Sequence, residues 1–363
     1  MFCEMVFALV ERKSSHAPTS HCEMLVTKVT PMIDVAVSMD EPPRNHGGVL
    51  GVVEFGGQSR NPDLAVGHPT IGIAMRERGR KPVREVWTSA SAVTSGVRDD
   101  IVYGHDGVHL FGAFRLPGAA SYRAATRSAY RRMVALLHDL GYPHLVRMWN
   151  HIGGINHTNA GGMEVYRDFC QGRAEGFEEA GTDMAAGLPA ATGIGSHGDG
   201  VTVYFIAERS GAPVHFENPR QVPAHRYPRE YGPRSPSFAR ATLLPASEKL
   251  FLSGTASIVG HRSTHAGDLD GQCDTTLENI RVLLADVSEK TGGKVEPDSF
   301  TMLKAYVRHE RDVPHVRRRL RDEVGPLVPL ALFTVDICRR ELLLEVEGVL
   351  TMKFSGEAGG AGS

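Results

Sequence analysis

The sequence predicts an α/β protein of the α+β type, in which two tandem units each form a mixed sheet with helices packed on one face. The length of 363 residues is sufficient for two hydrophobic cores. The main evidence is a long-period repeat. Gly112 and Gly254 lie 142 residues apart in similar strand-like segments, and Thr202 and Glu345 lie 143 residues apart in two later ones. The nearly equal offsets indicate two copies of one unit.

Each copy contains the same succession of segments. A first strand is followed by a stretch with the apolar spacing of a helix, which ends at Gly141 in copy one and at Gly292–Gly293 in copy two. A second strand, a second helix and a closing strand follow. The expected elements are strands 108–114, 145–150 and 200–207 with helices 122–141 and 162–177 in copy one, and strands 249–256, 301–308 and 343–349 with helices 275–290 and 314–324 in copy two.

The repeat divides the chain into four parts. We expect a loose N-terminal segment at 1–45, a degenerate N-terminal unit at 46–215, a C-terminal unit with the active site at 216–354, and a flexible glycine-rich tail at 355–363. Residues 47–57 and 71–75 are predicted strands that precede the repeat. Two similar units favour a ligand site between the copies, because domain interfaces are common places for pockets.

Composition argues against several classes of function. The net charge of −2 provides no basic field for nucleic acid or an anionic membrane. No apolar run reaches the roughly 18 residues of a membrane span. The five scattered cysteines lack zinc-ligand spacing, so reduced thiols and a cytoplasmic location are expected. His261 and His265 lie four residues apart, but in a loop-like stretch without carboxylate partners, so no metal site is predicted. The sequence contains no flavin or nucleotide motif, and we predict no cofactor.

Two glutamates lie in the apolar segment Leu343–Val349. Because side chains alternate along a strand, Glu345 and Glu347 share a face. A carboxyl group on an apolar face loses hydration and its pKa rises, so it holds a proton near neutral pH and can act as a general acid. An ordinary strand with a solvated polar face explains the same pattern. The repeat favours a specific role for Glu345, because the other copy has Thr202 at the equivalent position. Glu347 is either structural or affects the charge of Glu345.

Two sets of motifs resemble known families. Tyr231–Ala241, Ser253–Thr255, Gln272, Thr276–Ile280 and Glu345–Glu347 resemble the RidA (YjgF) family, small trimers whose closing strand supplies a glutamate at the position of Glu345. A longer ordered series resembles the chorismatases more closely, although His151 and Arg262 depart from the expected pattern. It comprises Arg147–Asn150, Ile155-Asn156, Tyr166–Cys170 with Gly172-Arg173, Pro189–Gly195, Asn218–Gln221, Tyr227-Pro228, Tyr231–Arg240 and Ser253–His261.

The resemblance implies an enzyme that releases pyruvate from chorismate by protonating its enolpyruvyl ether, with Glu345 as the acid. Chorismate has two carboxylates, and arginine binds a carboxylate through two parallel hydrogen bonds. The candidate substrate ligands are Arg240, Arg220 and Arg147, with Tyr227 and Thr255 as further hydrogen-bond donors.

The resemblance also implies that two small pocket positions select the product. Gly254 and Cys338 favour 3-hydroxybenzoate over hydrolysis to a dihydroxycyclohexadiene carboxylate. A RidA-like imine deaminase and a non-catalytic small-molecule binder are alternatives. The arginine that deaminases carry before the closing strand is absent from Pro326–Ala331 and Pro189–Ala191, which disfavours deamination. The expected partner is the small molecule chorismate, and a monomer or a homo-oligomer such as a trimer fits the sequence.

Overall fold

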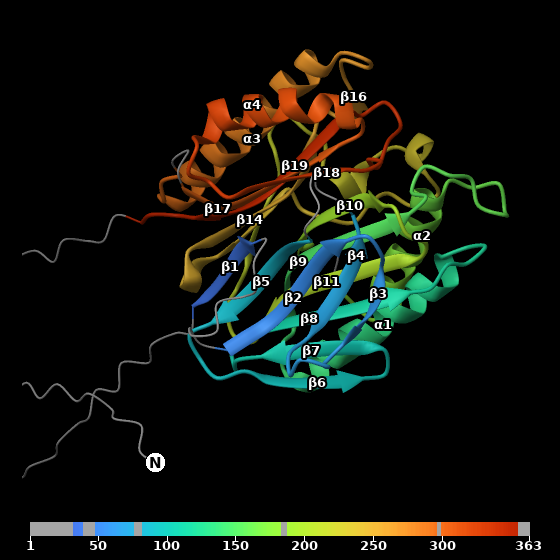
Figure 1. Cartoon of the computed structure of the whole chain (residues 1–363), viewed down its shortest axis with the longest axis vertical. Coiled ribbons are helices and arrows are strands. Elements are labelled where there is room, and N and C mark those ends of the chain that lie inside the picture. Colours follow the sequence, from blue (N-terminus) through green and yellow to red (C-terminus); the bar gives the residue numbers. More distant parts are fainter. Residues whose placement is uncertain (1–31, 39–47, 76–81, 183–186, 296–298, 355–363) are drawn as a thin grey trace, which may run out of the picture.

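In the described part of the chain, three large β-sheets pack around a shared core, with helices on the outer faces of two of them (Figure 1). The computed structural model describes residues 32–38, 48–75, 82–182, 187–295 and 299–354. The predicted tail 355–363 and most of the predicted loose segment 1–45 lie outside these residues. None of the described helices is long and apolar enough to cross a membrane.

The first sheet contains five strands in the order β1-β5-β2-β4-β3. The strands are β1 (Ile33–Ser38), β2 (Gly48–Gly56), β3 (Arg60–Asp63), β4 (Thr70–Ala74) and β5 (Val83–Ser89). The sheets do not follow the predicted division of the chain at this point. Strand β1 lies within the segment that was expected to be loose, and the predicted unit 46–215 contributes strands to both the first and the second sheet. The alternation that buries Ile33 and Val35 is short, and β1 pairs with a strand about fifty residues later, so local pattern alone does not identify it.

The second sheet has the order β10-β9-β11-β8-β7-β6 and packs against helices α1 and α2. Its elements are β6 (Thr94–Arg98), β7 (Ile101–His105), β8 (His109–Leu116), α1 (Arg123–Leu140), β9 (His144–Gly153), α2 (Val165–Glu179), β10 (Ala190–Ser196) and β11 (Val201–Glu208). Gly141 adopts a left-handed conformation after α1, with φ of 77°, as expected of a C-terminal glycine.

The third sheet has the order β12-β13-β14-β19-β17-β18 and packs against helices α3 and α4. Its elements are β12 (Val214–Phe216), β13 (Ala241–Leu244), β14 (Lys249–Ala256), α3 (Leu269–Thr291), β17 (Phe300–Val307), α4 (Val313–Val324), β18 (Leu330–Thr334) and β19 (Leu344–Thr351). A two-stranded ribbon, β15 (Ile258–Val259) with β16 (Arg262–Ser263), follows β14.

The order of strands confirms the two predicted copies. The second sheet contains β10-β9-β11-β8 and the third contains β18-β17-β19-β14, so equivalent strands occupy equivalent places. All four predicted helices and all six predicted strands of the repeat are present. The sequence pattern did not reveal β10 and β18, which pair in parallel with β9 and β17.

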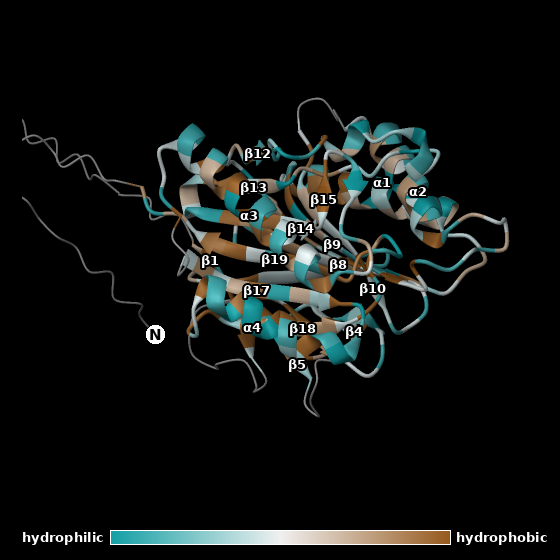
Figure 2. Ribbon diagram, turned by 90° about the horizontal axis from the view of Figure 1, so that it is seen from above, coloured by the Kyte–Doolittle hydropathy of each residue, from teal (hydrophilic) through white to brown (hydrophobic). Residues whose placement is uncertain are grey.

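The central strand β19 has two different faces. Leu344 and Val346 belong to the apolar cluster beneath α3 and α4, whereas Val349 belongs to the core shared by the three sheets. Figure 2 shows hydrophobic colour concentrated on the strands and hydrophilic colour on α1 and α4. Glu345 and Glu347 therefore project away from the helices into the region between the sheets, on one face as predicted.

Candidate active site

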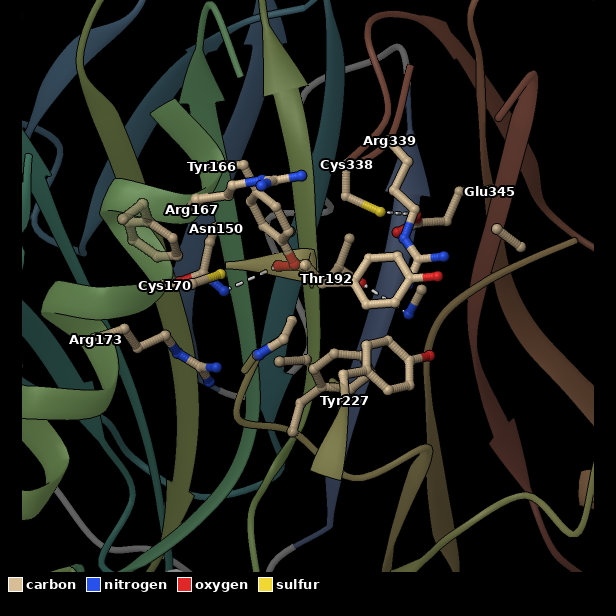
Figure 3. Close-up of a pocket in the computed structure, with 18 of the residues that line it drawn as sticks. Asn150, Tyr166, Arg167, Cys170, Arg173, Thr192, Tyr227, Cys338, Arg339 and Glu345 are labelled. Atoms are coloured by element: carbon tan, nitrogen blue, oxygen red, sulfur yellow. Dashed lines mark hydrogen bonds between the residues drawn. The ribbon is translucent and has the colours of Figure 1, made fainter. Parts of the chain in front are cut away.

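A pocket lies between the second and third sheets. The two copies meet here through β10, whose Gly195 N–H donates to the Asp336 carbonyl at 2.8 Å and whose Ile194 bridges Ile337. Figure 3 shows side chains from α2, β9 and β10 facing Cys338, Arg339 and Glu345 across the pocket. The position agrees with the expected site between copies.

Glu345 is one of two carboxyl groups in the pocket lining, together with Glu164, and its side chain is buried. Its register neighbours are Ala256 on β14 and Tyr306 on β17. The Cys338 thiol donates to Oε2 of Glu345 across 3.8 Å. Burial, and secondly the negative charge of Glu347, raise the pKa of Glu345 to about 8, so this group is predominantly protonated at neutral pH. The expected acid therefore has the protonation state that proton donation requires.

Glu347 differs from Glu345 although it lies two residues further along the same strand face. It is absent from the pocket lining and accepts hydrogen bonds from Tyr306 at 2.7 Å, Trp149 at 3.1 Å and Thr192. Arg147 at 2.5 Å and Lys304 at 2.7 Å form ion pairs with it. These cations and hydrogen bonds outweigh burial and lower the pKa of Glu347 to about 2, so its carboxylate stays charged.

Gly254 provides the space that the Glu345 carboxyl group occupies. It lies in β14 at an irregularity in the pairing between Leu252 and Thr255. A Cβ at position 254 would overlap Oε1 of Glu345 and lie 3.2 Å from Thr192 Oγ1. The absence of a side chain at Gly254 therefore allows the Glu345 carboxyl group to occupy this position.

Arginine side chains supply positive charge around the pocket. Arg240 is 3% exposed, donates to the Tyr227 hydroxyl at 2.8 Å and leaves its buried Nε without a hydrogen-bond partner. Arg173 is also buried and leaves its Nε unpartnered. Arg339 stacks on the Tyr231 ring with its guanidinium 4.0 Å from the ring centre. The Arg240 Nε lies 3.9 Å from a Glu217 carboxylate oxygen, so a ligand carboxylate at Arg240 would compete with this long ion pair, whereas Arg173 and Arg339 form no ion pair within the described residues.

Five of the eight predicted site residues line this pocket: Glu345, Arg240, Tyr227, Gly254 and Cys338. The structure places the other three elsewhere. Arg147 is committed to the buried Glu347, because the two strands bring opposite charges together. The Thr255 hydroxyl donates to the Ser253 carbonyl at 3.0 Å, since alternation turns its side chain away from that of its neighbours. Arg220 lies before the β15–β16 ribbon in sequence, and its backbone carbonyl accepts a hydrogen bond from the Gly260 N–H at 2.8 Å.

Sequence reasoning did not assign several pocket residues. Tyr166 and Arg173 lie seven residues apart on α2 and therefore point from the same helix face. Both belong to a recognised motif, and their helical spacing was an available signal. Thr192 on β10 and Arg339 beside Cys338 also line the pocket, but no local pattern distinguishes them from ordinary polar residues.

Comparison with known proteins identifies similar enzymes. The family described as "Chorismatase FkbO/Hyg5-like, N-terminal" matches residues 85–207. A 3-hydroxybenzoate synthase of Streptomyces hygroscopicus is 46% identical over 83% of this chain and 91% of its own length. A chorismatase of Streptomyces hygroscopicus is 42% identical over 83% of this chain and 89% of its own length. A crystal structure of a chorismatase has a TM-score of 0.84 and 39% identity, covering 89% of this chain and 98% of the other.

Proposed function

The chain belongs to the chorismatase family, and from this premise we propose that it converts chorismate into 3-hydroxybenzoate and pyruvate. The observation on which the proposal rests is a buried carboxyl group, Glu345, that is protonated near neutral pH and faces a pocket containing arginines. Such an acid can protonate an enol ether, and the cations can hold a substrate with two carboxylates.

The reaction begins with transfer of the Glu345 proton to the terminal methylene carbon of the enolpyruvyl group. This carbon becomes the methyl group of pyruvate, and positive charge develops on the adjacent ether carbon. The neighbouring ring hydroxyl attacks that carbon, and the bond between this hydroxyl oxygen and its ring carbon then breaks, whereas the original ether oxygen stays on the ring. Loss of the proton from the ring carbon that bears the ether oxygen makes the ring aromatic. The bond between the ether oxygen and the former ether carbon breaks, which releases pyruvate with the former hydroxyl oxygen as its keto oxygen, and the ether oxygen takes up the hydroxyl proton as the phenol of 3-hydroxybenzoate. The ring proton replaces the one that Glu345 donated, so the atoms of chorismate divide between the two products without consumption of water.

The two carboxylates of chorismate would bind at the positively charged ends of the pocket. We assign Arg240 to one of them, because its buried guanidinium is held by Tyr227 and its Nε makes no hydrogen bond, with only the longer ion pair to Glu217 at 3.9 Å. Arg173, on the opposing helix α2, is the corresponding candidate for the other. Binding at both ends would fix the enol ether relative to Glu345, and such orientation lowers the barrier by restricting the reacting groups.

Gly254 and Cys338 support the 3-hydroxybenzoate branch rather than hydrolysis. Both line the pocket beside Glu345 and both are small. Their position relative to the acid determines which nucleophile, the ring hydroxyl or a water molecule, can reach the positively charged carbon. The similarity to a relative named 3-hydroxybenzoate synthase supports the same branch.

The test is incubation of the purified protein with chorismate. We expect equal amounts of pyruvate, followed with lactate dehydrogenase, and 3-hydroxybenzoate, followed by liquid chromatography. Glu345→Gln should bind chorismate with little change in affinity and lose turnover, because the amide cannot donate an acidic proton. Absence of pyruvate would refute the activity, and pyruvate with a non-aromatic diol would refute the product. Normal turnover by Glu345→Gln would refute the choice of acid.

The oligomeric state and the cytoplasmic location remain predictions. Sedimentation of the purified protein would distinguish a monomer from a trimer. Fractionation of the native cells with an antibody to the chain would test the location.

A further inference from the structure

We propose that Glu347 is a positioning residue for this reaction: its fixed negative charge, anchored behind the pocket by Arg147 and Lys304, keeps the neighbouring Glu345 carboxyl group protonated and favours return of its proton after each turnover. The inference rests on the proposed role of Glu345 as the acid. Glu347 itself does not line the pocket.

The geometry gives Glu347 a permanent charge. Its Oε1 accepts from Tyr306 at 2.7 Å and Trp149 at 3.1 Å and pairs with Lys304 at 2.7 Å. Its Oε2 accepts from Arg147 at 2.5 Å and from Thr192. Trp149 and Lys304 at Oε1 and Arg147 at Oε2 can only donate, so a proton on either oxygen of Glu347 would point at a group that cannot accept it. A carboxylate with five donors is stabilised in its charged form even when it is only 1% exposed.

Glu345 faces this charge with little to neutralise it. The Cys338 thiol is its closest donor, at the long distance of 3.8 Å. Titratable and charged groups surround it on several elements. They are Glu347 on β19, Arg147 on β9, Tyr166 and Cys170 on α2, Arg240 before β13, Tyr306 on β17, and Cys338 with Arg339 after β18, and the same pocket is also lined by Glu164, Arg167, Arg173, Tyr227 and Tyr231. Among them Glu347 is the charge that disfavours ionisation of Glu345 most, and it is second only to burial.

The charges behind the pocket form a balanced set of four. Lys304 lies between Glu347 and Glu85, at 2.7 Å from a carboxylate oxygen of each, and Arg147 pairs with Glu347 on its other side. Two cations thus face two carboxylates in a region that is almost fully buried. One cation can therefore be removed together with either carboxylate while the total charge is preserved, which avoids leaving a buried charge without compensation.

Thr192 connects this network to the pocket. Its hydroxyl donates to Glu347 and accepts from the Gly254 backbone N–H at 3.1 Å. Glu347 therefore fixes the strand segment against which Glu345 packs, as well as setting its charge. A purely structural role would change stability and the rate, but it would leave the titration of Glu345 in place. The test must consequently measure that titration.

The decisive experiment is an infrared titration of the Glu345 carboxyl group in the full-length protein, in which Glu345→Gln in the same background is subtracted. We compare the wild type with the charge-balanced variant Glu347→Gln/Lys304→Met. The protonated-carboxyl band of Glu345 should disappear about one pH unit lower in this variant, the size typical of losing a nearby like charge. The alkaline limb of kcat with chorismate should move in the same direction.

The matched control is Glu85→Gln/Lys304→Met. It removes the same number and signs of charges but leaves Glu347 with Arg147, Thr192, Tyr306 and Trp149. Its Glu345 band should not move to lower pH. An unchanged band in Glu347→Gln/Lys304→Met, or an equal downward shift in the control, would overturn the inference.

A single substitution covers the case in which the first double variant does not fold. Lys304→Met leaves Glu347 charged with one cation fewer, so the Glu345 band should persist to higher pH than in the wild type; a band that stays or falls contradicts the inference. The infrared readout needs no turnover. Failure of the wild type to release pyruvate would therefore refute the proposed function alone, whereas unchanged titrations in an active enzyme would refute only the role of Glu347.

Discussion

Substitution of Gly254 by alanine tests how closely the acid is positioned. The added Cβ would overlap Glu345 Oε1 and lie 2.8 Å from its Cδ, with Thr192 Oγ1 at 3.2 Å on another side. The obstructed atoms are the end of a side chain rather than backbone. We therefore expect the Glu345 carboxyl group to move while the strand β14 stays in place.

The magnitude follows from the size of that displacement. Restoring an ordinary carbon–oxygen contact requires a shift on the order of 1 Å, and a misplacement of this size costs roughly 100-fold in rate. Each factor of ten corresponds to about 1.4 kcal/mol, so the barrier to the proton transfer should rise by about 2.7 kcal/mol. The free energy of unfolding should change by less than about 1 kcal/mol, because only a side-chain end has to adjust.

The assay measures kcat and the ratio of 3-hydroxybenzoate to diol, with urea unfolding as the control for stability. Gly254→Ala should lower kcat about 100-fold and increase the share of diol, because the displaced acid leaves the positive centre open to water. A rescue variant, Gly254→Ala/Glu345→Asp, shortens the acid by one methylene and removes the overlap. It should be more active than the product of the two single effects predicts. Wild-type kcat and product ratio in Gly254→Ala would refute the reasoning, and so would strictly multiplicative effects in the double variant.

Three further predictions concern other groups. The wild-type kcat should fall about tenfold per pH unit above about 8, because Glu345 loses the proton that it donates; a profile that is flat to pH 10 would contradict this assignment. Arg240→Lys should raise KM for chorismate about tenfold with a smaller effect on kcat, since lysine cannot form the paired hydrogen bonds, and an unchanged KM would remove Arg240 from the substrate site. Asp106, which accepts from the backbone N–H of Val108 and His109 and pairs with the His109 ring at 3.1 Å, has its pKa lowered by these bonds despite burial. Its contribution to stability is therefore present above the unfolded pKa near 4 and lost as pH falls below it. Asp106→Asn should cost about 1–3 kcal/mol in urea unfolding at pH 7 and progressively less in acid, with kcat unchanged; an equal cost at pH 3 would contradict the linkage.

The repeat could be predicted because its signals are local. Helical spacing, terminal glycines and strand alternation are each visible within a single element. The nearly equal offsets between the two copies then showed that these elements occur in the same order twice. The helices α1 and α3 and the strands β14 and β19 therefore agree with the sequence prediction. The parallel strand β10 was missed because its short sequence, rich in alanine and glycine, becomes a strand only through pairing with β9.

The candidate active site was predicted in part for the same reason. Tyr227 and Arg240 were each predicted to bind the substrate, and the structure joins them by a hydrogen bond of 2.8 Å. Arg147 was expected to bind substrate, yet its guanidinium faces Glu347. Tyr166 and Arg173 reach the pocket because α2 packs beside β10, a relation that no short segment contains.

The sequence by itself determined that Glu345 and Glu347 share one face of a strand, because alternation is a property of the extended backbone. Only the tertiary structure decided that the first is protonated at the pocket and the second is charged behind it. That difference comes from Arg147, which lies 200 residues from Glu347 in sequence, from Lys304 on β17, and from the gap that Gly254 leaves for Glu345. Protonation depends on which charges and donors surround a group in space, and those neighbours are brought together by the packing of separate strands.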